Sequence, residues 1–299
     1  MKTIKQRISY AVMGLMAMGF TACTQNEDMA PTLKGQEINA TFSVGGMQTR
    51  VNTLGHGNNW EDKDKLKVSI FTEYDSGSTT VLSFNSTTNE WSRTGSFRWL
   101  NEYEQHTILA VYPSDMDSWI NNLQYDLQTD QSSEGNLKNA DLITGYWHDV
   151  PRFDLISIPM KHRMSLVTIV YHVGTADYPN MDISEPQVYS KHTSVDFSRD
   201  DRGQFVMSTP TANPAWVKAY KHDDGMFSAI VIPGSYIKDE VFLKFMIGDN
   251  IFNAKMKMPT DFEEGKRYTY KLDVGKDKVK LTQISVDDMT GWTNEEDLK

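Results

Sequence analysis

Apolar and polar residues alternate along most of this chain from residue 37 onward. A period of two places successive side chains on opposite faces of an extended strand, so the pattern predicts half-buried β-strands. The clearest case is the segment 38–44, which is followed by Gly45 and Gly46. Its apolar residues, which we expect on one buried face, are Ile38, Ala40, Phe42 and Val44.

Further strands are predicted from the same alternation or from short apolar runs. Pro113 ends one such run, and the turn 248–250 (Gly-Asp-Asn) joins two alternating segments into a predicted β-hairpin. The predicted segments are 65–70, 108–112, 241–247, 252–258, 268–274 and 279–281.

No long window repeats apolar residues at a helical period. Short strands separated by Gly, Asn and Asp are typical of β-sandwiches, so the sequence predicts an all-β protein. The loop-rich, polar segment 114–139 is predicted to be a surface excursion. The chain is too long for one small core, and a polar, proline-containing stretch at 148–154 marks the expected boundary. We therefore expect an N-terminal sandwich domain over 37–154 and a C-terminal one over 155–299.

The first 22 residues depart from this pattern and indicate a signal peptide, because basic residues precede a short apolar run over 10–20. That run is shorter than the ~20 residues of a membrane-spanning helix. Its ending resembles a bacterial lipoprotein signal, in which Cys23 becomes the lipidated first residue of the mature chain. The alternative is an ordinary cleaved signal followed by an incidental cysteine. We expect residues 1–22 to be removed, Cys23 to carry the lipid and 23–36 to form a flexible tether.

Charge and cysteine content exclude several classes of function. The formal net charge of −10 argues against nucleic acid and anionic lipid headgroups as partners. Cys23 is the single cysteine, so it can form neither an internal disulfide nor a cysteine-rich metal site. The chain contains none of the familiar nucleophile-elbow, zinc-protease or phosphate-loop motifs. We predict a non-enzymatic protein without a cofactor or metal, in which His162 is a hydrogen-bonded core residue.

The seven tryptophans leave a second kind of site open, because flat aromatic rings stack on sugar faces. Most of them are expected in the core. Trp91 and Trp99 flank a polar turn and Trp119 lies in the polar segment, so these three are predicted to be exposed and are the candidates for sugar stacking.

Several short segments follow one another in the order seen in a known family. They are 49–50, 60–71, 110–113, 140–143, 158–166, 230–233, 265–270 and 291–292. Together they resemble the Mfa-like fimbrillin family, the subunits of bacteroidete type V pili, with Met160 where that family usually has Phe. The resemblance implies two tandem transthyretin-like, Greek-key β-sandwich domains.

The resemblance also implies a route of assembly. Pilins of this family reach the cell surface as lipoproteins, and an arginine-specific protease then cuts after an arginine that follows the first strand. The matching residue here is Arg50, and Val51 becomes the new N-terminus. Loss of the first strand opens a groove, which a strand of a neighbouring subunit fills. By analogy that donor strand lies within 279–286.

The sequence thus favours a subunit or accessory component of a cell-surface pilus that serves adhesion. Its expected partners are other pilin subunits, the outer membrane through the lipid anchor, and a surface receptor. The alternative is a surface lipoprotein that is never cut and binds glycans or host proteins. A surface hydrolase is the third hypothesis.

Overall fold

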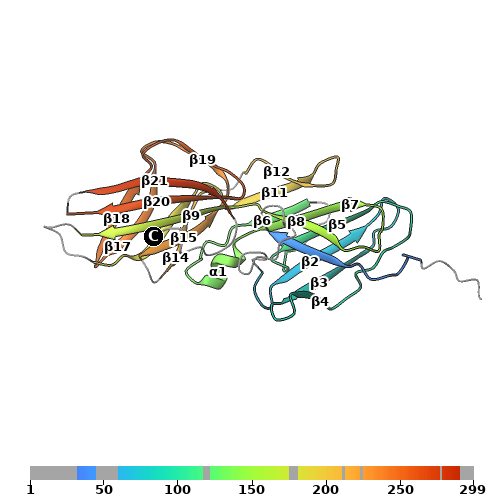
Figure 1. The fold of residues 1–299 in the computed structure, drawn as a ribbon. Coiled ribbons are helices and arrows are strands. Elements are labelled where there is room, and N and C mark those ends of the chain that lie inside the picture. The colour runs from blue at the N-terminus through green and yellow to red at the C-terminus, as the bar shows by residue number, and fades with distance from the viewer. Residues whose placement is uncertain are drawn as a thin grey trace, which may run out of the picture. The chain divides into compact units, whose positions relative to one another are not determined.

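A computed structural model describes residues 32–44, 60–116, 122–174, 181–210, 213–222, 225–276 and 278–289. The described chain is mostly β-strand, with one short helix, and its strands form several sheets (Figure 1). This confirms the predicted β-rich fold. None of the helices in these ranges is long and apolar enough to cross a membrane.

The largest sheet has seven strands in the order β1-β8-β7-β5-β2-β3-β4. β1 lies at one edge and runs parallel to β8, whereas every other neighbouring pair in this sheet is antiparallel. Its members are β1 (Ala40–Val44), β2 (Lys65–Phe71), β3 (Ser78–Asn85), β4 (Glu90–Arg93), β5 (His106–Tyr112), β7 (Ile143–Asp149) and β8 (Ile156–His162).

The two edges of this sheet are joined by backbone hydrogen bonds. The segment before β1 pairs with the segment after β4, because the Gly35 N–H donates to the Trp99 carbonyl at 2.8 Å and the Ile38 N–H to the Phe97 carbonyl at 3.0 Å. The sheet therefore curls around its own apolar face. The core enclosed there contains buried residues of every strand except β4, whose Trp91 packs against it.

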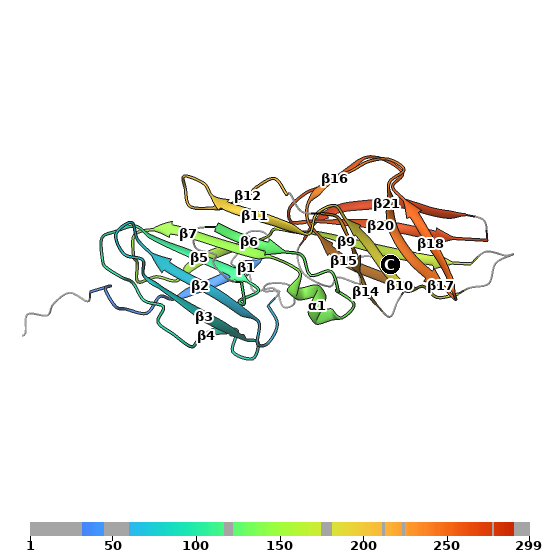
Figure 2. The ribbon, with the colours of Figure 1, turned by 180° about the vertical axis from the view of Figure 1, so that it is seen from behind.

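The remaining strands form four smaller sheets, in the orders β13-β10-β17-β18, β14-β15-β9-β20-β21, β12-β11-β6 and β16-β19 (Figure 2). They are β6 (Asn122–Asp126), β9 (Ser165–Val173), β10 (Ser184–Ser190), β11 (Ser194–Arg199), β12 (Phe205–Met207), β13 (Ala215–Lys218), β14 (Tyr220–Lys221), β15 (Met226–Val231), β16 (Gly234–Tyr236), β17 (Val241–Ile247), β18 (Asn250–Lys255), β19 (Thr260–Phe262), β20 (Lys266–Val274) and β21 (Val279–Asp288).

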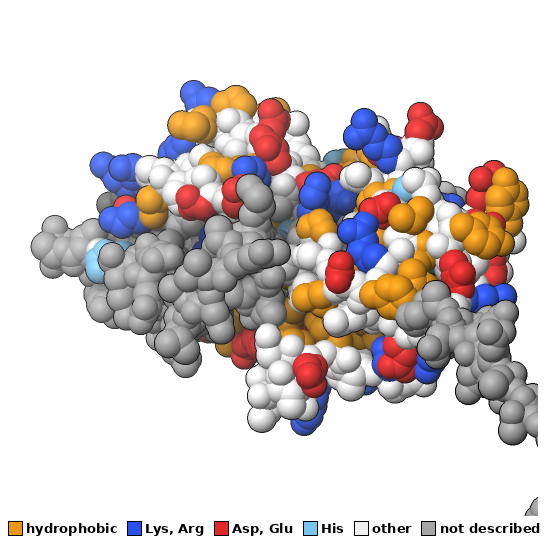
Figure 3. Space-filling model, turned by 45° about the vertical axis from the view of Figure 1, so that its right-hand side comes forward, with side chains coloured by type: hydrophobic (Ala, Val, Ile, Leu, Met, Phe, Trp, Pro, Cys, Tyr) orange, Lys and Arg blue, Asp and Glu red, His pale blue; other side chains and the backbone are white. Residues whose placement is uncertain are grey.

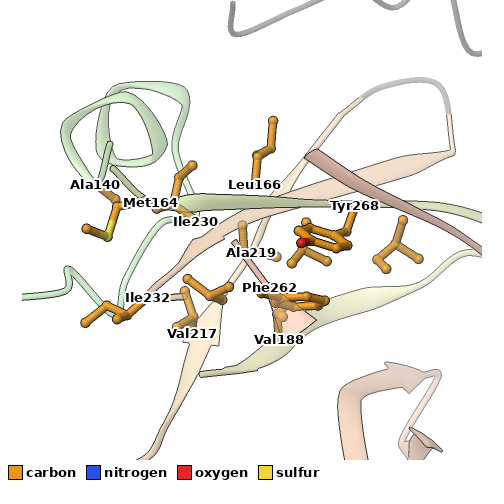
Figure 4. Packing of buried hydrophobic residues seen from close by; sticks show 14 of the residues in the cluster. Ala140, Met164, Leu166, Val188, Val217, Ala219, Ile230, Ile232, Phe262 and Tyr268 are labelled. Carbon is orange, nitrogen blue, oxygen red and sulfur yellow. The ribbon is translucent and has the colours of Figure 1, made fainter. Parts of the chain in front are cut away.

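A second cluster of buried apolar side chains lies among these sheets, and it also includes Leu109 and Val111 of β5 (Figure 4). Phe262 and Tyr268 belong to it, with ring centroids 4.2 Å apart, as do Val188 of β10 and Val217 of β13. Residues that precede 154, including Leu123 of β6, also contribute to it.

Most predicted strands are present where the alternation placed them. β1, β2, β5, β17, β18, β20 and β21 overlap the predicted segments, and Gly248 adopts the positive φ of 57° that its hairpin turn needs.

The prediction that 114–139 is a loop-rich surface excursion is wrong, because several of its residues are buried. β6 and the helix α1 (Glu134–Asn139) lie within it. β6 buries only Leu123 and Tyr125. The segment therefore contains a half-buried strand although most of its residues are polar. Ser133 caps α1 by accepting a hydrogen bond from the Asn136 N–H.

Candidate functional site

The candidate site is the groove that β1 occupies at the edge of the seven-stranded sheet. Phe42 is completely buried, Ile38 and Val44 are buried, and Ala40 is half-buried. The predicted alternation of the first strand is therefore confirmed. Apolar contact with the groove holds one face of β1, and β8 binds one edge of its backbone.

Phe42 packs into an aromatic cluster built by three other strands and by Trp60, which precedes β2. Its ring lies 5.5 Å from that of Trp91 of β4, at an interplanar angle of 74°. Trp91 in turn contacts Trp60, at 5.3 Å, and Phe84 of β3, at 5.1 Å. The fifth ring is that of Tyr112, 5.6 Å from Trp60. Edge-to-face contacts of this kind add to the stability that burial provides.

Trp60 also binds the backbone of β1. Its indole Nε1–H donates a buried hydrogen bond of 2.9 Å to the Phe42 carbonyl. This bond depends on the position of the strand and not on the side chain that the strand carries. Sequence reasoning assigned Trp60 no role in the groove, because a tryptophan ahead of a charged turn belongs to no periodic pattern.

β1 contributes to the sheet by pairing with β8. β1 pairs with β8 from Ala40 opposite Ile156 to Val44 opposite Met160. On its other side β8 pairs with β7 only from Met160 to His162. Within the described part of the chain, β1 is thus the only strand that pairs with the first half of β8.

Exposed ion pairs hold the segment just before β1. Glu37 bonds to Arg98 at 2.9 Å and also to Arg93. Exposed pairs of this kind contribute little to stability, about 0–1 kcal/mol each. Apolar packing and backbone pairing are therefore the main forces that hold β1.

A buried polar pair lies at the end of β8. His162 and Asp141 contact through Nδ1 and Oδ2, and the Asp141 side chain is completely buried. Burial raises the pKa of the Asp141 carboxyl, and the neighbouring His162 opposes that shift. The prediction that His162 is a hydrogen-bonded core residue is confirmed. No group of three or more His, Cys, Asp or Glu in the described ranges is arranged to hold a metal.

The structure describes two of the three tryptophans considered for sugar stacking. Trp99 has only 2% of its surface exposed, so the prediction of its exposure is wrong. It packs on His106 and Trp147, at 5.3 and 5.5 Å. Trp91 is half-buried, and its ring meets Phe42 in the groove. Trp119 lies outside the described residues, as do Cys23, Arg50 and Val51.

Exposed aromatic rings are instead found on two loops. Tyr74, between β2 and β3, is 78% exposed, and Tyr103, between β4 and β5, is 79% exposed. One face of the molecule carries hydrophobic side chains among acidic and basic ones (Figure 3). No periodicity could identify these residues, because both lie in loops.

The fold is β-rich, and the groove at the edge of its seven-stranded sheet holds the chain's own strand β1. The pattern that defines the fimbrillin-like family matches residues 49–290, and the chain belongs to that family. The resemblance seen in the sequence is thereby confirmed. Membership identifies a non-enzymatic protein of the fimbrial and cell-surface adhesion type.

Solved structures share this fold. A crystal structure of a protein assigned to cell adhesion, from Bacteroides ovatus, has a TM-score of 0.62 at 13% identity and covers 87% of this chain and 99% of its own. A second such protein, from Bacteroides uniformis, has a TM-score of 0.58 at 14% identity, with 77% and 93% covered. At these identities the similarity shows the fold alone. None of the curated proteins compared with this chain matches it.

Proposed function

We propose that this protein is a subunit or accessory component of a cell-surface pilus and serves adhesion. Assembly begins with proteolysis after Arg50, which frees Val51 and separates β1 from the rest of the chain. A strand of another subunit then takes the place of β1. The observation that carries this proposal is the position of β1 as an edge strand, bound by packing and by one strand neighbour among the described residues.

Loss of β1 would leave a surface that another strand can fill. The first half of β8 would lose its only described strand neighbour, which leaves backbone N–H and C=O groups open to β-augmentation. The apolar sites of Ile38, Phe42 and Val44 would open to water, at about 1.5–3 kcal/mol for each side chain. A head-to-tail repeat of this contact does not close, so it produces a fibre.

The remaining elements of the proposal follow from the sequence. Residues 1–22 are the signal peptide, and Cys23 carries the lipid that holds the precursor on the outer membrane. The tether is shorter than the expected 23–36, because Leu33 packs against the first core cluster and Gly35 and Gln36 are hydrogen-bonded to Trp99. Two transthyretin-like, Greek-key sandwich domains form the body. The two separate core clusters support two domains, and the pairing of β8 with β1 and β7 favours a division after His162 over one at residue 154.

Limited proteolysis tests this function. The unlipidated chain from Gln25 onward is treated with an arginine-specific protease, and intact mass locates each cut. We expect one early cut after Arg50, followed by ladders on an unboiled denaturing gel. Arg50→Gln is the control and should prevent both. A cut monomer that never associates with itself or with other pilins would contradict the proposal.

A second candidate function is a surface lipoprotein that is not cut and binds glycans or host proteins. The exposure of Tyr74 and Tyr103 favours it, since exposed tyrosines supply contact area at low entropic cost. Saturable binding of the uncut monomer on a glycan array, lost in the double variant Tyr74→Ala/Tyr103→Ala, would support this function.

A further inference from the structure

The groove has a distinct site for one large side chain. Phe42 is completely buried, and its ring lies against Trp91, which also contacts Trp60 and Phe84. If a small side chain replaced this ring, a cavity would remain, because well-packed aromatic neighbours relax only partly. The groove therefore discriminates between strands by the residue at the Phe42 position.

The groove holds the backbone at the same position by a separate contact. Trp60 donates its indole N–H to the Phe42 carbonyl. Any strand in the register of β1 offers a carbonyl there, so this bond adds affinity without selecting a side chain. The site occupied by the Phe42 ring therefore selects which strand binds.

The strand β21 of a second copy fits this site poorly. β21 contains no aromatic residue. If Ile284 takes the position of Phe42, Val286 takes that of Val44, but Lys280 takes that of buried Ile38. With Leu281 at the Phe42 position, Gln283 falls at the position of buried Val44.

β21 is also engaged within its own sheet. It pairs antiparallel with β20 from Val279 opposite Val274 to Asp288 opposite Lys266. Its Leu281 is buried in the second core cluster. Donation of β21 to another copy would break this pairing and expose Leu281. The contacts that the groove offers to β21 do not replace that pairing and that burial.

We infer that the strand that completes this groove carries an aromatic side chain at the Phe42 position and is not β21 of a second copy. The inference rests on the proposed replacement of β1. The partner is an extended segment that repeats the pattern of β1: an apolar residue, a small residue, an aromatic residue and an apolar residue, each separated by one position. The groove thus disfavours self-assembly through β21.

Peptide exchange into the cut chain tests the inference. The chain from Gln25 onward is cut after Arg50, or at a specific protease site placed within 47–53, and fluorescent peptides are titrated against it by anisotropy. The peptides are 36–45, its Phe42→Ala form, its Thr41→Ala form as the matched control, 279–288, and 279–288 with Ile284→Phe.

We expect the 36–45 peptide and its Thr41→Ala form to bind within about threefold of one another, because Thr41 lies on the other face of β1. The Phe42→Ala form should bind at least about tenfold more weakly. The 279–288 peptide should bind at least about tenfold more weakly than 36–45, and Ile284→Phe should recover part of that loss.

Two protein variants separate backbone recognition from side-chain recognition. Trp60→Phe should weaken the binding of the 36–45 peptide and of its Phe42→Ala form by the same factor. Trp91→Ala should reduce the difference between these two peptides.

The inference is overturned if the Phe42→Ala peptide binds within threefold of 36–45, or if 279–288 binds as tightly as 36–45. In both cases the replacement of β1 still stands. If 36–45 itself does not exchange into the cut chain, β1 is not replaceable, and the proposed function fails together with the inference.

Discussion

Phe42 and Trp91 contact one another edge to face, with centroids 5.5 Å apart, although their strands β1 and β4 form the opposite edges of one seven-stranded sheet. The curl of the sheet brings these edges together. This aromatic contact joins the two edges beside the backbone hydrogen bonds between them, and it helps to hold the strand whose departure we propose. The sequence singled out both residues for unrelated reasons. Phe42 was predicted to lie on the buried face of the first strand, and Trp91 was a candidate for sugar stacking.

Removal of the Phe42 ring should strongly destabilise the protein. Phe42→Ala is expected to lower the free energy of unfolding by about 3–5 kcal/mol, because the ring is completely buried and its neighbours cannot fill the space. Urea denaturation measures the change. Tyr74→Ala is the control and should stay within about 0.5 kcal/mol of the parent, since Tyr74 is exposed. Equal effects of the two variants would show that β1 does not pack as described.

Loss of the Trp60 N–H should have a smaller effect. Trp60→Phe keeps an aromatic ring but removes the donor to the Phe42 carbonyl, and we expect a loss of about 0.5–1.5 kcal/mol from the hydrogen bond alone. Hydrogen exchange should also become faster at the backbone of β1. Trp147→Phe, which changes a ring that packs on Trp99, is the matched control and should leave exchange in β1 unchanged.

His106 should make stability depend on pH. Its Nε2 accepts a hydrogen bond from the Leu100 N–H at 3.0 Å, so the ring is neutral with the proton on Nδ1, which lies 2.9 Å from the Glu104 carbonyl. Burial lowers the pKa of His106, so the unfolded chain takes up a proton more readily than the folded chain. The stability contributed by the neutral ring is present above about pH 6.5 and is lost as pH falls through the lowered pKa.

Urea denaturation at pH 7.5 and pH 5.5 tests this dependence. His106→Gln should lose part of the difference between the two conditions, whereas His172→Gln, which changes an exposed histidine, should retain it. A His106→Gln variant with the full parental difference would contradict the assignment.

The Asp141–His162 pair should be important for stability as a unit. Asp141→Ala leaves the buried His162 ring without its carboxylate partner, and we expect a loss of about 3–5 kcal/mol. A double-mutant cycle with His162→Ala measures the coupling, since the loss in the double variant should fall short of the sum of the single losses. Asp126→Ala, on the exposed side of β6, is the control and should have little effect.

Part of the candidate site could be predicted from residues near one another in the sequence. The alternation over 38–44 predicted which face of β1 is buried, and that face is the one in the groove. The sequence did not predict that Trp99 is buried, because a tryptophan beside a polar turn has no periodic neighbours to show which way it points. Nor did it reveal β6, whose partner β11 follows it by about 70 residues.

The sequence by itself determined several of the strands, the membership in the fimbrillin-like family and the apolar face of β1, because alternation and short motifs are local properties of the chain. Only the tertiary structure decided that β1 is a parallel edge strand, that β8 depends on it, and that Trp60 and Trp91 bind its backbone and its aromatic ring. The physical reason is that sheet order, strand direction and side-chain packing depend on contacts between segments far apart in the sequence. Periodicity within one segment carries no information about the segment that packs against it.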